Sequence, residues 1–395
     1  MAFRTNKTPV LQEKSASGSV ATFNTALAMP LASCNIAVNA WQEGSGDPSP
    51  DNVRNIVPRR EVNITQTGKN IKPKTGKNAT YVGVRVSYDE NEDTYTLNGT
   101  SSIGDILLAE ISRNNLKWKK GSLYTISVRV ISGDWTIGSG TGITFAVALF
   151  SASVSSRYIR GVTNLTNPNS LNGYTAKDNA FDDSTGYKLY FQCWRDGSVF
   201  NNLKLKIQIE VGNDATDYAP YITPEVKTID LGEDTYGAVI NTVDGGKDDT
   251  HVKVDLSSQN WGSYGANRFY FALPPTARAK QTNLTSLCSC YKREPNNSEA
   301  SNMANLSFCV QTGYVVIRDD SFNNDLTAFV NSLTGQELTY ELATPVDGTP
   351  ITPTPITTFE GDNTIFADTG DVDLTYKDLD IAKRGNFREV FKLPS

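Results

Sequence analysis

An alternating run near the middle of the chain, residues 203–211, constrains the fold more than any other stretch. Apolar and polar residues take turns along it: Leu203, Lys204, Leu205, Lys206, Ile207, Gln208, Ile209, Glu210 and Val211. A period of two predicts a β-strand with one buried face and one wet face. Gly212 ends the run, and Pro220 in the Tyr-Ala-Pro-Tyr segment that follows cannot continue a strand ladder. We therefore expect the last strand of a β-sandwich, followed by a new module.

The same alternation recurs upstream, whereas helical periodicity is nearly absent. Strands are expected around residues 82–86, 95–97, 124–130, 145–149 and 189–193. Polar turns separate them, including an acidic turn at 89–93 that we interpret as a solvated loop. Several short alternating strands joined by loops are typical of a sandwich. The predicted fold class is all-β, with a central jelly-roll sandwich over residues 80–221.

Smaller β modules are expected on both sides of this sandwich. The predicted division is an N-terminal arm at 1–20, a β module with a Gly/Pro-rich loop at 21–79, the sandwich at 80–221, a C-terminal β-rich module at 222–376 and a C-terminal arm at 377–395. A polar segment without apolar residues to bury orders only against a partner, which is why both ends are interpreted as arms.

The C-terminal module contains the one helix that the sequence predicts, roughly residues 324–333. Asn323 or Asn324 is the expected cap, and Gly335 is the expected stop. Further on, the sequence around 369–371 predicts a final β-hairpin.

Composition argues against several functional classes. The net charge of −6 is unlike the basic face of a nucleic-acid binder. Five scattered cysteines with a single histidine favour buried reduced thiols over a zinc or redox site. The start of the chain lacks the apolar core of a signal peptide, and no run approaches ~18 apolar residues. We expect synthesis in the host cytoplasm, no membrane insertion, no metal and no cofactor.

Catalytic signals are weak. His251, the only histidine, stands in a polar segment, and no Gly-x-Ser-x-Gly elbow accompanies it. The carboxylates Asp178, Asp182 and Asp183 could hold calcium, although a solvated acidic loop is the favoured interpretation. We expect a protein that is not an enzyme, and a polysaccharide-degrading activity is the less favoured alternative.

A carbohydrate-binding surface is the most specific site hypothesis. If residues 189, 191 and 193 face the core, Tyr190, Gln192 and Trp194 face outward, where flat aromatic rings can stack on sugars. Arg129 and Arg195 are the expected hydrogen-bond donors. The alternative is that Trp194 packs beneath a loop or against a neighbouring subunit. Trp135 is a weaker candidate of the same type.

Three groups of motifs carry a resemblance to a known family. They are Phe-x-Thr-x-Leu-Ala-x-Pro-Leu at 23–31 with the Gly/Pro-rich segment 44–54 and Thr-Gly-Lys-Asn at 67–70, then the strand end and Ala-Thr-Asp-Tyr-Ala-Pro-Tyr at 208–221, and last Tyr-Glu-Leu-Ala-Thr-Pro at 340–345 with the segment 362–376. In this order they resemble bacteriophage and prophage tail or minor structural proteins that carry a carbohydrate-binding-module-like jelly roll. Residues 1–17 and roughly the last 15 depart from that pattern. Thr-Gly-Lys-Asn also recurs at 75–78, without an evident reason in the sequence.

The resemblance implies a non-catalytic virion protein, such as a tail, baseplate or fibre component that takes part in host-surface glycan recognition and adsorption. The implied partners are other virion proteins through the terminal arms, two further copies in a homotrimer, and host glycan. The alternative within this class is a capsid decoration or head-fibre protein with a purely structural role.

Overall fold

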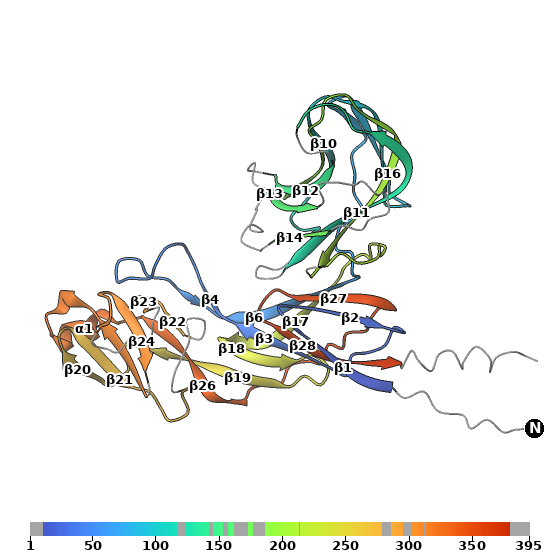
Figure 1. Ribbon diagram of the computed structural model, residues 1–395. Helices are drawn as coiled ribbons and strands as arrows, with labels where there is room; N and C mark the ends of the chain where they lie inside the picture. The colour runs from blue at the N-terminus through green and yellow to red at the C-terminus, as the bar shows by residue number, and fades with distance from the viewer. Residues whose placement is uncertain are drawn as a thin grey trace, which may run out of the picture. The chain divides into compact units, whose positions relative to one another are not determined.

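The computed structural model describes residues 11–116, 123–141, 145–152, 157–161, 173–176, 186–212, 214–278, 286–294, 302–311 and 313–379 (Figure 1). Strands make up most of the regular structure, and the described residues contain a single α-helix, so the all-β class is confirmed. The chain forms two compact units. Unit 1 comprises the described residues within Met1–Ala32, Ile64–Lys227 and Thr357–Ser395, and unit 2 comprises Ser33–Asn63 and Thr228–Ile356.

Unit 1 contains a sandwich of two antiparallel sheets. The six-stranded sheet has the order β14 (Gly173–Ala176), β11 (Tyr124–Thr136), β16 (Ser198–Val211), β9 (Thr94–Ser101), β8 (Val84–Asp89), β7 (Ala79–Tyr81). The four-stranded sheet has the order β10 (Gly104–Ile111), β15 (Tyr187–Cys193), β12 (Ala146–Ser151), β13 (Arg157–Gly161). From β9 to β16 the chain passes repeatedly between the two sheets, so most neighbouring strands are distant in sequence, the exceptions being β12 with β13 and the consecutive strands β7, β8 and β9.

The sandwich core follows the predicted alternation. On β16 the side chains of Leu203, Leu205, Ile207 and Ile209 are all buried. Phe191 of β15 meets Phe145 and Phe200 in edge-to-face contacts, with ring centroids 4.4 and 5.4 Å apart. Burial of these apolar faces is the main stabilising contribution to the sandwich, and the buried Tyr95 hydroxyl is compensated by donating to the Thr75 carbonyl.

Two strands of the sandwich differ from the prediction. Strand β10 was not expected, because a bulge between Leu107 and Ala109 interrupts its alternation and turns Leu108 and Ala109 both inward. Val82 was expected inside a strand, but it has a φ of 45° and forms the tight turn between β7 and β8 with Gly83. Turns with positive φ at both central residues match the twist of a hairpin, which explains the interruption.

A further layer in unit 1 joins the two ends of the chain. Strand β1 (Leu11–Gly18) pairs with β28 (Val372–Leu379), and β27 (Gly361–Ala367) pairs with both β2 (Val20–Thr25) and β6 (Arg59–Thr67). The prediction of a β-hairpin around residues 369–371 is therefore wrong. The turn is present, but the strands on either side of it pair with different N-terminal strands.

This pairing also changes the interpretation of the arms. Residues 11–18, expected in the N-terminal arm, form a strand, and so do residues 377–379 of the expected C-terminal arm. Residues 1–10 and 380–395 lie outside the described part. The expected module at 21–79 differs as well, because β2 belongs to unit 1 and β3 (Ser33–Asn39) to unit 2.

The polar face of β16 is not wet along its whole length. Gln208 and Glu210 are each about 1% exposed, contrary to the expectation from the alternation. Residues 214–219 return over them: Glu210 accepts hydrogen bonds from the backbone N–H and the hydroxyl of Thr216, and Gln208 Oε1 accepts one from Ala219 N. The buried polar groups are thus paired, as burial requires.

The repeated Thr-Gly-Lys-Asn motif has a structural explanation. In each copy the asparagine Oδ1 accepts a hydrogen bond from a backbone N–H of a sandwich strand, Asn70 from Ile209 and Asn78 from Tyr88. Each lysine forms an ion pair with a sandwich glutamate, Lys69 with Glu210 and Lys77 with Glu110. A Cβ atom on either glycine would lie within 3 Å of a side chain, Ile222 for Gly68 and Tyr88 for Gly76. Both copies therefore attach an extended segment to the sandwich in the same way.

Unit 2 is also built from sheets. In one of them the strands of unit 2 follow one another in the order β3, β18 (Gly237–Asn241), β19 (Lys247–Asp255), β26 (Glu337–Asp347), β22 (Leu287–Cys288). Another has the order β20 (Trp261–Gly265), β21 (Arg268–Ala272), β25 (Tyr314–Arg318), β24 (Ser307–Gln311), β23 (Lys292–Arg293). Strands β4 (Trp41–Gln42) and β5 (Ile56–Val57) form a short pair, and β17 (Glu225–Thr235), like β6, crosses the sequence boundary of the units.

The predicted helix is present in unit 2 as α1 (Leu326–Ser332), after a short 3-10 turn, η2 (Asp320–Phe322). Its cap is Asp325, whose carboxylate accepts from Ala328 N, rather than Asn323 or Asn324. Both asparagines have left-handed φ angles, 47° and 67°, which place them in the turn before the helix. Phe329 is fully buried and stacks on Phe269 at 4.0 Å.

Candidate functional site

The outward face of the four-stranded sheet carries three of the five residues that the sequence nominates. Leu189, Phe191 and Cys193 of β15 are buried in the core, as predicted. Tyr190 and Gln192 therefore point to the other side of the sheet, and Trp194 follows directly after the strand end. The three residues lie on the same side of the sheet, but Gln192, which the alternation predicted to be exposed, is buried at 1% exposure.

Trp194 combines exposure with a fixed orientation. Its side chain is 40% exposed, and its indole N–H donates a hydrogen bond of 2.7 Å to Asp105 Oδ1. Ile103, 64% exposed, precedes Gly104, which pairs with Cys193 in the strand register. Two exposed apolar side chains therefore occupy neighbouring positions at this end of the sheet. A ring held in place loses little conformational entropy when a ligand covers it.

Asp105 connects Trp194 to Gln192. The two strands place Asp105 opposite Gln192, and Gln192 Nε2 donates to the same carboxylate oxygen at 3.0 Å. Gln192 is 1% exposed, and within the described residues its Oε1 has no hydrogen-bond partner. An unpaired buried acceptor is uncommon, and because this oxygen is buried, a ligand on the outer surface does not reach it.

Tyr190 contributes a second ring. It packs edge to face against Phe150, with centroids 5.3 Å apart. Partial burial raises the pKa of Tyr190, and the charges of Asp105 and Glu110 raise it further. The phenol therefore keeps its proton at neutral pH and can donate a hydrogen bond.

Of the two arginines, Arg129 is placed differently from what the sequence suggested, whereas Arg195 directly follows Trp194. Arg129 lies on β11 opposite Lys206, in the six-stranded sheet, so it belongs to the other outer face of the sandwich and cannot join Trp194 in one site. Alternation within one strand identifies an outward residue but not the sheet that carries it. Arg195 is half-buried in the turn after β15, where its carbonyl accepts from Ser198 Oγ. Trp135, the weaker candidate, is half-buried and packs against Phe145, 5.7 Å between centroids.

Asp105 is the functional candidate that the sequence analysis missed. It stands on β10, whose bulge hid the strand, and its importance comes only from the register that brings it beside Gln192 and Trp194. A single aspartate before an apolar run carries no signal of its own.

The catalytic and metal hypotheses acquire no new support. His251 lies on β19 of unit 2, with its Nδ1 2.9 Å from Thr250 Oγ1. Within the described part of the chain, no group of three or more potential metal-ligating side chains occurs, and Asp178, Asp182 and Asp183 lie outside that part. All five cysteines are buried. The acidic turn at 89–93 is not wholly solvated, because Asp93 is 2% exposed and pairs with Lys72.

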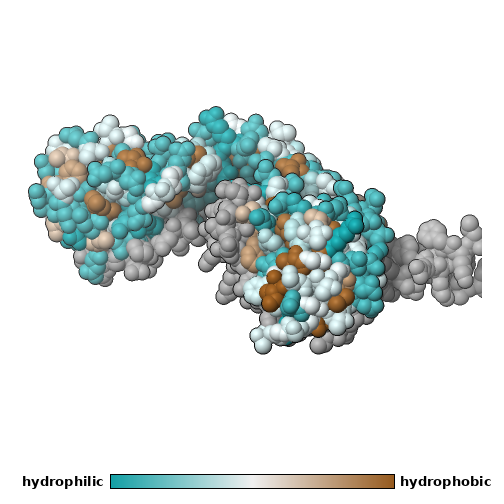
Figure 2. Space-filling model, turned by 90° about the horizontal axis from the view of Figure 1, so that it is seen from above, coloured by the Kyte–Doolittle hydropathy of each residue, from teal (hydrophilic) through white to brown (hydrophobic). Residues whose placement is uncertain are grey.

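In comparisons with known proteins, no family model matches the chain and no curated protein is detectably similar to it. None of the helices in the described ranges is long and apolar enough to cross a bilayer. Figure 2 shows hydrophobic side chains in small patches on one face of a largely hydrophilic surface. The interpretation as a phage protein therefore rests on the sequence motifs alone.

Proposed function

We propose that this chain is a non-catalytic bacteriophage virion protein of the tail, baseplate or fibre, and that its sandwich takes part in recognising host-surface glycan. The observation that carries the proposal is the exposed Trp194 ring, oriented by Asp105 and on the same side of β15 as the phenol of Tyr190. Glycan sites need a flat apolar surface for the sugar face and a few fixed polar groups for its hydroxyls. Both are present at the end of β15.

The strand connectivity supports the same proposal. Placing β10, β12, β13 and β15 in one sheet and β9, β11, β14 and β16 in the other is the arrangement expected of a jelly roll, a fold common among lectin and viral capsid domains. Fold alone does not imply function, so the weight rests on the Trp194 site. Assembly into a homotrimer belongs to the proposal because virion appendages are symmetric.

The test is binding of the full-length protein to an array of bacterial capsular and cell-wall polysaccharides. We expect binding by the unaltered protein and a loss of roughly 30-fold in affinity for Trp194→Ala, since removing a contact surface of this size costs about 2 kcal/mol. Trp194→Phe, which keeps a flat ring but loses the bond to Asp105, should bind with intermediate affinity.

Ile131→Ala is the matched control. Ile131 is 45% exposed on β11 in the other sheet, so its removal also deletes an exposed apolar side chain but should leave glycan binding unchanged. Equal losses for both variants, or no polysaccharide binding by the folded protein, would favour the alternative of a purely structural capsid decoration or head-fibre protein.

A further inference from the structure

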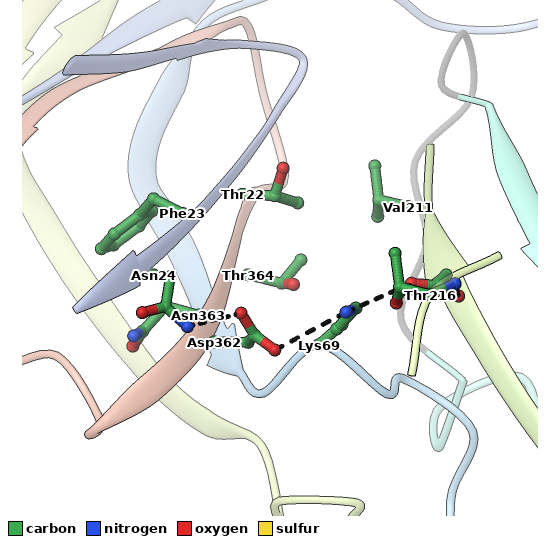
Figure 3. A pocket seen from close by; sticks show the side chains of 10 residues that line it. Thr22, Phe23, Asn24, Lys69, Val211, Thr216, Asp362, Asn363 and Thr364 are labelled. Atoms are coloured by element: carbon green, nitrogen blue, oxygen red, sulfur yellow. Dashed lines mark hydrogen bonds and ion pairs between the residues drawn. The ribbon is translucent and has the colours of Figure 1, made fainter. Parts of the chain in front are cut away.

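A cavity lies in unit 1, and none of its lining residues belongs to the Trp194 site. Its volume is about 270 Å³. Strands β2 and β27, the segment around Lys69, the end of β16 and Thr216 contribute the walls (Figure 3). The lining residues are Thr22, Phe23, Asn24, Lys69, Glu210, Val211, Thr216, Asp362, Asn363 and Thr364.

Lys69 supplies hydrogen-bond donors that the protein does not use. Its ammonium nitrogen lies 3.8 Å from Glu210 Oε2 and 3.7 Å from Asp362 Oδ2, on opposite sides (Figure 3). Both separations exceed a hydrogen bond, and among the described residues Lys69 has no closer polar partner. The side chain is 23% exposed, so the ammonium is held by charge while its N–H groups still require acceptors.

The two carboxylates differ in what they can still accept. Glu210 already receives hydrogen bonds from Thr216 and from Gln208 Nε2, and its side chain is 2% exposed. Asp362 Oδ1 accepts from Asn24 Nδ2 at 2.7 Å, whereas its Oδ2 faces Lys69 and makes no hydrogen bond to the described residues. The Asp362 side chain is 37% exposed. A free acceptor and a free donor group thus stand side by side at the cavity wall.

This combination selects the chemistry of a ligand. The formal charge of one lysine and two carboxylates is negative, so a phosphate or sulfate is disfavoured, and an apolar ligand would leave the ammonium unsolvated. Adjacent hydroxyl groups meet both needs, because one can donate to Asp362 Oδ2 while its neighbour accepts from Lys69. Val211 adds apolar surface for ring carbons, whereas the Phe23 ring lies on the core side of β2 and packs on Tyr376. The volume lies just below the ~300–1,000 Å³ of ordinary ligand pockets, which limits the ligand to about one sugar ring.

We propose that this cavity binds a neutral sugar residue through a vicinal diol held between Lys69 and Asp362. The inference concerns a site distinct from the Trp194 face and does not depend on it, because the two sites share no residue. A protein with both would contact a glycan at two separate points.

The experiment is titration of the full-length protein with methyl glycosides of neutral hexoses, deoxyhexoses and N-acetylhexosamines, followed by saturation-transfer NMR. We expect at least one glycoside to bind with a dissociation constant in the millimolar range, as suits a single small pocket. Lys69→Met keeps the aliphatic stem but removes the donors, and should weaken binding roughly tenfold or more. Asp362→Asn, which conserves shape, should weaken it as well.

Lys77→Met is the matched control, because Lys77 occupies the equivalent position in the second Thr-Gly-Lys-Asn copy and pairs with exposed Glu110. It should leave glycoside binding unchanged. Repeating the Lys69→Met comparison in a Trp194→Ala background removes any glycoside bound at the Trp194 face, which separates this inference from the proposed function. Circular dichroism confirms that each variant is folded. Absence of binding up to about 50 mM glycoside would overturn the proposal. So would Lys69→Met and Asp362→Asn proteins that bind as tightly as the unaltered protein, or a preference for inorganic phosphate or Ca²⁺.

Discussion

A buried ion pair, Lys72 with Asp93, allows the sharpest test of how unit 1 is stabilised. The ammonium and carboxylate are 2.8 Å apart, and their side chains are 0% and 3% exposed. Lys72 also donates to the carbonyl of Pro73, and the Asp93 carboxylate accepts from the phenols of Tyr88 and Tyr218 at 2.8 and 3.0 Å. The pair attaches the extended segment after the first Thr-Gly-Lys-Asn copy to the turn between β8 and β9.

The perturbation that isolates the charge is Asp93→Asn. Asp93 has a φ of 51°, a region that asparagine also tolerates, so the backbone is not strained by the change. Removing one partner of a buried pair leaves the other charge uncompensated, which costs about 3–5 kcal/mol. The cost of the uncompensated charge has an upper limit, because the folded variant can lose the Lys72 proton and bury a neutral amine instead. At about 1.4 kcal/mol per pH unit, from pH 7 to the ordinary lysine pKa of 10.5, this limit is about 5 kcal/mol.

The pH dependence has a defined sign. Burial lowers the pKa of Lys72, and the charge and hydrogen bond of Asp93 oppose that effect. Without Asp93 the pKa of Lys72 in the folded variant falls further. At any pH between this lowered pKa and the lysine pKa of the unfolded chain, Lys72 is protonated in the unfolded chain but neutral in the folded one. Stability of the variant should therefore rise with pH across this window, and its deficit relative to the unaltered protein should shrink toward about pH 10.

The assay is hydrogen exchange measured by mass spectrometry on the full-length chain in increasing urea. Peptides from β9 and β16 report on unit 1, and peptides from β21 in unit 2 are the internal reference, since a chain with two units need not unfold in one step. Glu110→Gln is the control variant: its pair with Lys77 is 51% exposed on the glutamate side and should cost at most about 1 kcal/mol. A cost for Asp93→Asn no larger than that control, or one independent of pH, would refute the reasoning.

Two further outcomes are expected in unit 2. Phe329→Ala should reduce the free energy of unfolding of unit 2 by about 3–5 kcal/mol in urea denaturation, because Phe329 is fully buried against Phe269 and Trp261. The control, exposed Thr327→Ala, should change it by less than about 0.5 kcal/mol. Equal effects of the two substitutions would contradict the stacking argument. Burial raises the pKa of the Cys309 thiol to about 11, so iodoacetamide at pH 8 should label it only after unfolding, as read by peptide mass, and rapid labelling of the folded protein would show that the thiol is accessible.

Some of these features could be predicted from sequence because they depend on local patterns. The alternation of residues 203–211 identified β16, and the spacing of Leu326, Phe329 and Leu333 identified α1, since a strand or helix that buries one face repeats its apolar residues at the period of that structure. Tyr190 and Trp194 were nominated by the same logic. Alternation predicts which side of its own strand a residue faces, but it does not predict which sheet contains that strand. Tyr190 and Arg129, which lie in different sheets, therefore could not be told apart from sequence.

Partners distant in sequence were decided only by the tertiary structure. Asp105 meets Trp194 across 89 residues because β10 and β15 align in register, and Asn24 meets Asp362 across 338 because β2 pairs with β27. Pairing over similar distances in sequence places β27 and β28 with different N-terminal strands. The cover over Gln208 and Glu210 comes from only 6 to 11 residues further on, but the alternation of β16 gives no sign of it. The sequence by itself determined that this protein is built of strands. Which strands pair, and hence which polar side chains share a surface or a cavity, depended on register and layer packing, which no local pattern encodes.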